Sequence, residues 1–196
     1  MNLIFEHQKQ AQIFNSTLCI IGITVSVMAI IDDISRASYG IMISDVMLLV
    51  ALILALVYIY RGHKKETAGY YKGMLYLFLI STLISIVVNI AITPAESARS
   101  LIGTTAIALI GFATVSAVAF IPNLGKKKSM LFAAINLAMR FSIFVIVSLL
   151  MLFVPRARET QSIQVIYRTF VLTVLSIVIY INTCYKYIDK AERNAE

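Results

Sequence analysis

The sequence predicts an all-α membrane protein, a bundle of six transmembrane helices that forms a single domain over residues 1–196. Three observations support this fold class. The mean hydropathy is +0.87, only 14% of the 196 residues are charged, and six apolar runs are each long enough to cross about 30 Å of hydrocarbon as a helix. Soluble domains carry about 25% charged residues and lack such a series of runs. The runs are also too long and too continuous for the strands of a barrel.

The six runs use most of the chain and leave little room for a second domain. The three prolines follow the ends of the third, fourth and fifth runs, where proline can end a helix without breaking one. The first dozen residues show no pattern of a cleaved signal peptide, so we expect them to be retained. The predicted spans are approximately 13–31, 41–60, 74–92, 101–121, 131–154 and 163–185.

The distribution of lysine and arginine predicts the orientation. The two tails and the second and fourth loops together hold eleven of these residues, whereas the first, third and fifth loops hold four. Loops rich in Lys and Arg stay in the cytoplasm, which predicts a multi-pass protein of the plasma (cytoplasmic) membrane with both termini inside. Topology therefore accounts for the net charge of +7, and we expect no nucleic acid as a partner.

Three charged residues fall inside the predicted spans, where charges normally face protein or water and find partners. Asp45 and Arg168 lie a few residues inside the outer ends of the second and sixth spans, so an ion pair between them is geometrically feasible. Counting back from Pro155 puts Arg140 about five residues inside the inner end of the fifth span. We interpret Arg140 as an inward-facing cation of the inner leaflet. The plainer alternative is that each charge is an interfacial residue at a helix end, with Arg140 snorkelling toward the headgroups.

Polar and small residues recur at steps of three and four in several spans, which places each set on one side of its helix. One interpretation is a polar cavity or pathway, for which we select Asp45, Ser85, Asn89, Asn136, Arg140 and Arg168. The competing interpretation is helix packing, because small residues let backbones approach and hydroxyl or amide groups bond across helices. The motifs Gly22-x-x-x-Ser26 and Ala113-x-x-x-Ala117 fit packing well.

Motifs of nucleotide binding, zinc proteases and paired cysteines do not occur in the sequence. We therefore expect no enzyme, no catalytic residue, no metal site and no cofactor. The leading hypothesis is a small-solute permease or the membrane-embedded substrate-binding or permease subunit of a transporter. Its partners would be the lipid bilayer and either a transporter subunit or further copies of the chain. The alternative is a non-transporting interaction protein, such as an assembly factor, an immunity protein or a signalling subunit, that binds partner helices.

In size and six-helix layout the chain is similar to the substrate-binding subunits of energy-coupling-factor vitamin transporters. Those proteins dock onto their partner through Ala-x-x-x-Ala in the first helix, where this chain has Gly22-x-x-x-Ser26. The similarity implies a six-helix bundle that binds a small solute between its helices. The similarity is limited to size and helix layout and does not include the docking motif.

Overall fold

The structure is a computed structural model that describes residues 2–36, 39–61, 68–92, 98–121, 125–153 and 163–193. Some side chains within these ranges are not described, and that of Asn89 is one of them. Helices account for nearly all of the described residues, and those residues include no strand. The six helices are α1 (Asn2–Ser35), α2 (Tyr39–Tyr60), α3 (Ala68–Ile92), α4 (Ala98–Phe120), α5 (Lys126–Phe153) and α7 (Ile163–Arg193).

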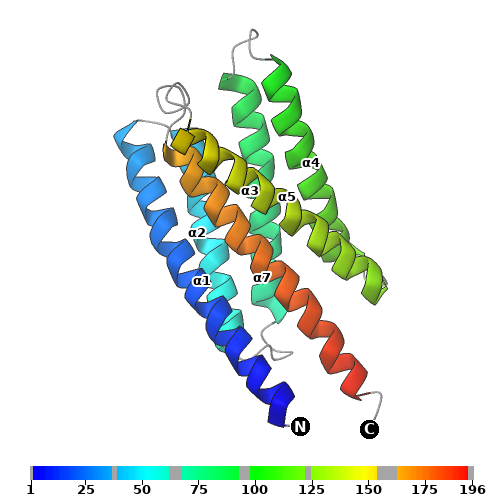
Figure 1. The fold of residues 1–196 in the computed structure, drawn as a ribbon. Coiled ribbons are helices and arrows are strands. Elements are labelled where there is room, and N and C mark those ends of the chain that lie inside the picture. Colours follow the sequence, from blue (N-terminus) through cyan, green and yellow to red (C-terminus); the bar gives the residue numbers. More distant parts are fainter. Residues whose placement is uncertain are drawn as a thin grey trace.

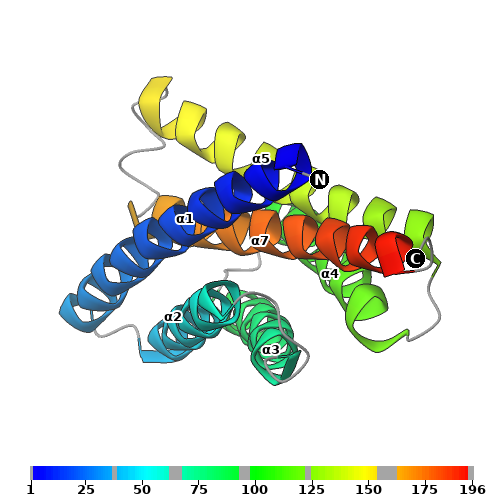
Figure 2. The same cartoon turned by 90° about the horizontal axis from the view of Figure 1, so that it is seen from below.

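The helices run alternately up and down, so the two ends of the chain lie at the same end of the bundle (Figure 1). Each helix packs on the next one along the chain, and α7 packs on α1 to close the ring and also reaches α2. Seen along the bundle, α7 lies between α1, α2 and α5, while α5 runs obliquely past it (Figure 2). Half of the apolar stretch of α7 is buried within the protein, against 11% of that of α5. The central position of α7 explains why it contributes to both polar sites described below.

Five helices are long and apolar enough to cross a membrane, namely α1, α2, α3, α5 and α7. Such helices are stable in lipid because each satisfies its own backbone hydrogen bonds. In α4, which has 23 residues, the described apolar part is the 13 residues of Ala108–Phe120. All-α architecture and a multi-pass membrane character are thereby confirmed, while the sixth crossing remains a prediction. Large apolar side chains are exposed on every helix, as expected for a surface that faces lipid.

The core lies mainly between α2, α3 and α7, with smaller contributions from the other helices. Gly22 shows why a small residue is needed on α1. A Cβ atom placed there would lie 3.1 Å from a methyl carbon of Leu52 and 3.3 Å from one of Val174, so a larger residue would require these side chains to shift by a few tenths of an ångström. The two residues of α4 that were predicted to pack against other helices are less buried than Gly22. Ala113 is exposed and Ala117 is half-buried. Ala113 therefore faces away from the other helices of this chain.

Candidate functional site

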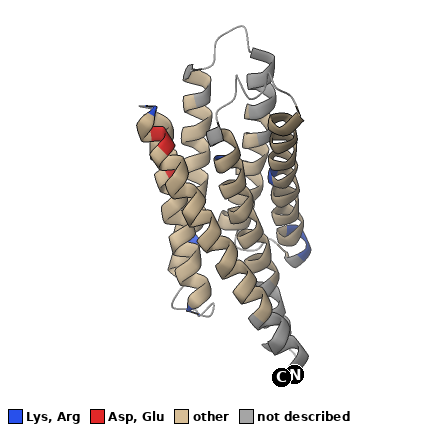
Figure 3. Ribbon diagram, turned by 60° about the vertical axis from the view of Figure 1, so that its left-hand side comes forward, with Lys and Arg blue, Asp and Glu red and all other residues tan. Residues whose placement is uncertain are grey.

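The first polar site joins Asp33 of α1, Asp45 of α2 and Arg168 of α7, and we call it the carboxylate cluster. It lies at the end of the bundle away from the termini, the end at which the acidic residues of α1 are seen (Figure 3). Arg168 Nε is 3.0 Å from Asp45 Oδ1, and the two side chains are only 14% and 3% exposed. The structure therefore forms the pair that the sequence allowed. Arg168 also donates from Nη2 to the carbonyl oxygen of Ile41 at 3.4 Å, which ties α7 to the first turn of α2.

Asp33 is the member of this cluster that the sequence analysis did not select. Its side chain is fully buried, and neither carboxylate oxygen has a hydrogen-bond donor as a partner. The Asp33 and Asp45 carboxyl groups interact with each other, and the positive charge of Arg168 acts on both. With all three groups ionised the cluster carries one surplus negative charge. Burying an ion costs several kcal/mol, so this surplus is a costly feature that packing alone does not require.

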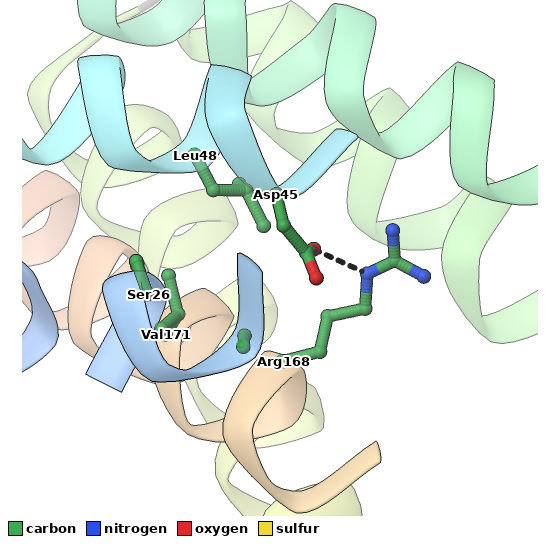
Figure 4. Close-up of a pocket in the computed structure, with 6 residues that line it drawn as sticks. Ser26, Asp45, Leu48, Arg168 and Val171 are labelled. Atoms are coloured by element: carbon green, nitrogen blue, oxygen red, sulfur yellow. Dashed lines mark ion pairs between the residues drawn. The ribbon is translucent and has the colours of Figure 1, made fainter. Parts of the chain in front are cut away.

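The carboxylate cluster is tightly closed. Asp45 and Arg168 line a space with Ser26, Leu48, Val171 and Ala29 (Figure 4), and that space is too small to admit a water molecule. Ser26 is buried, and its hydroxyl has no hydrogen-bond partner. The charges of Asp45 and Arg168 consequently interact in a largely buried environment, in which coulombic forces are stronger than in water.

The second polar site surrounds Arg140 of α5, and we call it the guanidinium site. Arg140 is 7% exposed, and Asn136, one helical turn earlier, is fully buried. Asn136 Nδ2 donates to the Ser176 hydroxyl at 2.9 Å, and the Thr173 hydroxyl donates to the Arg140 carbonyl oxygen at 3.2 Å. These two bonds hold α5 against α7. The inward direction predicted for Arg140 agrees with this burial.

Arg140 lies near the middle of the described part of α5. The helix begins at Lys126, five residues before the predicted span, so Arg140 lies 14 residues from its start and 13 from its end. At 1.5 Å per residue, each end is roughly 20 Å away along the helix axis. A side chain that is only 7% exposed is packed between helices, which does not suit an arginine that snorkels along a lipid-facing surface.

The polar stripe of α3 packs against α2. The hydroxyls of Ser44 and Ser81 are 2.7 Å apart, and that of Ser85 is 3.1 Å from Ser44. Ser85 also donates to the Ser81 carbonyl oxygen at 2.7 Å. Ser85 was selected as a pathway residue, yet in this structure its hydroxyl joins two helices. The side chain of Asn89, the other pathway residue of this helix, lies outside the described residues, as do the three prolines and much of the second and fourth loops.

Long apolar helices with charged groups buried between them define the class: this chain is a multi-pass helical membrane protein. A scan against protein-family models, a search of curated proteins and a search of solved structures each found no match to it. Any more specific function has to be argued from the two polar sites.

Proposed function

We propose that the chain is a small-solute permease, or the membrane-embedded subunit of one, of the plasma membrane. It would cross the membrane six times and keep both termini in the cytoplasm. The observation that carries this proposal is the carboxylate cluster, where three helices bring two carboxyl groups and one guanidinium group together in the largely buried interior of the bundle. Ionisable groups inside membrane bundles are expensive, and they mark substrate or ion pathways more often than structural contacts.

The orientation rests on the eleven-to-four imbalance of Lys and Arg between the two sets of connecting segments. Both ends of the described chain lie at the same end of the bundle (Figure 1), as an even number of crossings requires. We expect a fluorescent protein fused to the C-terminus to fluoresce in bacterial cells, and alkaline phosphatase fused there to be inactive. The reverse result would place the C-terminus outside and contradict the topology.

A permease should carry at least one small solute across a bilayer. The full chain, reconstituted in liposomes, should take up one solute saturably from a panel of labelled amino acids, hydroxy acids, sugars and amines. Asp45→Asn and Arg168→Gln should each reduce that uptake about tenfold or more, the effect of losing roughly 1.4 kcal/mol of interaction. The matched control is Asp32→Asn, because Asp32 forms an ion pair with Arg36, whose side chain is 50% exposed.

A second function is favoured by the closed packing of the carboxylate cluster and by the outward face of α4, which exposes Ala106, Leu109, Ile110 and Ala113. A helix-binding interaction protein would use such a face, since small residues let another helix approach closely. If no solute is taken up saturably and copurification of a membrane partner depends on Ala113, the interaction protein replaces the permease.

A further inference from the structure

Arg140 is a buried cation whose hydrogen-bonding capacity is largely unused. Two of its three guanidinium nitrogens, Nε and Nη2, are buried and have no hydrogen-bond partner. Neither of the two ion pairs among the described residues involves Arg140, since they join Arg36 to Asp32 and Arg168 to Asp45. A buried charge that lacks a partner costs far more than a paired one. Within the part of the chain that the structure describes, the guanidinium therefore has no negatively charged partner.

The surroundings of the guanidinium indicate what it would bind. The ring of Phe78 lies on one side, with its centroid 5.7 Å from Cζ. Gly111 of α4 lies on another side, where an added Cβ would be 3.1 Å from Arg140 Nη2 and 3.3 Å from Asn136 Oδ1. Asn136 Oδ1 is itself buried and without a hydrogen-bond partner. Two unused donors and one unused acceptor thus belong to side chains that meet at the backbone of one glycine.

This combination is selective. A guanidinium fork binds carboxylate and phosphate oxygens in pairs, and the carbonyl oxygen of Asn136 accepts a hydrogen bond but cannot donate one. A ligand that satisfies all three atoms must carry a negative charge and, beside it, a hydroxyl or an amine. A simple anion such as acetate would leave Asn136 Oδ1 unsatisfied, which costs binding free energy.

We propose that the guanidinium site, made by Arg140, Asn136 and the backbone at Gly111, binds a small oxyanion with a hydroxyl or amino group next to its charge. The anion is either a free solute, such as a hydroxy acid or an amino acid, or the headgroup of an anionic lipid. The proposal deepens the permease function and rests on it for transport, whereas binding is a separate property. Entry requires α4 to separate from α5, and α4 packs chiefly on α3 and α5, which leaves it at the edge of the bundle (Figure 2).

Binding is measured on the full chain in a neutral detergent, by thermal unfolding at constant ionic strength. The probes are glycolate and acetate, which differ in the hydroxyl. Glycolate should raise the melting temperature with a half-saturating concentration about fivefold below that of acetate, the usual effect of one hydrogen bond. Arg140→Gln should weaken glycolate binding about tenfold or more, because a charge-assisted contact is lost.

The steric test is Gly111→Ala, which keeps the charge and adds a methyl group beside Arg140 Nη2 and Asn136 Oδ1. It should also weaken glycolate binding, and it remains informative if Arg140→Gln does not fold. Gly69→Ala is the matched control, since an added Cβ at Gly69 meets nothing within 4 Å, and it should bind as the wild type does. Equal glycolate effects in the wild type, Arg140→Gln and Gly111→Ala would overturn the proposal.

The two sources of the anion are separated in lipid nanodiscs. A rise in melting temperature with phosphatidylglycerol over phosphatidylcholine that requires Arg140, with no further effect of glycolate, identifies the lipid headgroup. A glycolate effect that persists in both lipids identifies a free solute. If neither probe acts through Arg140, the guanidinium is hydrated only and the site does not exist.

The same variants separate the site from the permease. Glycolate binding that depends on Arg140, without uptake of any solute into liposomes, would support the guanidinium site and refute the permease function. If Arg140→Gln leaves both saturable uptake and glycolate binding unchanged, the permease function stands and the guanidinium site is refuted.

Discussion

Replacing Asp33 and Asp45 together by asparagine should destabilise the protein by about 3–5 kcal/mol, the cost of leaving a buried charge without its partner. Each single replacement should cost less than about 1 kcal/mol, because the cluster holds one more carboxyl group than guanidinium groups. Asp45→Asn leaves Asp33 to balance Arg168, and Asp33→Asn leaves the 3.0 Å contact between Arg168 and Asp45 in place. Only the double variant leaves Arg168 without a carboxylate partner among the described residues of the cluster.

The measurement is a double-mutant cycle on the free energy of unfolding in mixed micelles. We expect a coupling of at least about 2 kcal/mol between Asp33 and Asp45, within the range found for residues of one network. Asp32→Asn is the control one residue away. It breaks an ion pair with an exposed Arg36, and exposed pairs contribute at most about 1 kcal/mol. Additive effects of the two single variants would show that Asp33 and Asp45 do not share Arg168.

Replacing Arg140 by methionine should stabilise the protein and raise the free energy of unfolding by about 1–3 kcal/mol. Methionine is apolar, unbranched and flexible enough to fill the space beside Phe78 and Gly111. It also removes two buried nitrogens that have no hydrogen-bond partner in the structure. A stabilised variant that has lost anion binding is the pattern expected where a protein keeps a costly group for function.

Arg168→Met is the matched comparison in the same assay, since Arg168 has a carboxylate partner 3.0 Å away. Its replacement should destabilise the protein, because the two carboxyl groups lose their only guanidinium in the cluster. A destabilisation by Arg140→Met as large as that by Arg168→Met would contradict the prediction. It would mean that the guanidinium of Arg140 already has partners that stabilise the fold.

The helices were predictable because the signal is local. A run of apolar residues satisfies its own backbone when it forms a helix, whatever its neighbours are, so α2 and the start of α7 agree with the predicted spans within about two residues. Where charged residues flank an apolar run, the helix extends beyond the predicted span. The predicted fifth span began at residue 131 because Lys126–Lys128 lower the local hydropathy, yet these lysines belong to α5.

The charged residues of the candidate sites were also visible, since Asp45, Arg140 and Arg168 interrupt apolar runs. Asp33 was not selected as a site residue because acidic residues lower the local hydropathy at the end of the first run. The first predicted span therefore stopped at residue 31, whereas α1 continues to Ser35. The i+4 spacing of Asp33 from Ala29 places Asp33 on the small and polar face of this helix, but that spacing alone did not lead to its selection as a site residue. Ser44 was missed because a lone serine near a helix start is unremarkable until its partner helix is known.

Hydropathy and charge along the chain decide that this is a multi-pass helical membrane protein and that a few charges are buried in it. Tertiary structure decides which of those charges meet. Helix neighbours and helix rotation bring Asp33, Asp45 and Arg168 together, leave Arg140 against Gly111, and turn Ser85 into a contact between two helices. The contact between Asp45 and Arg168 joins residues 123 positions apart, and no local pattern specifies how one helix turns toward another.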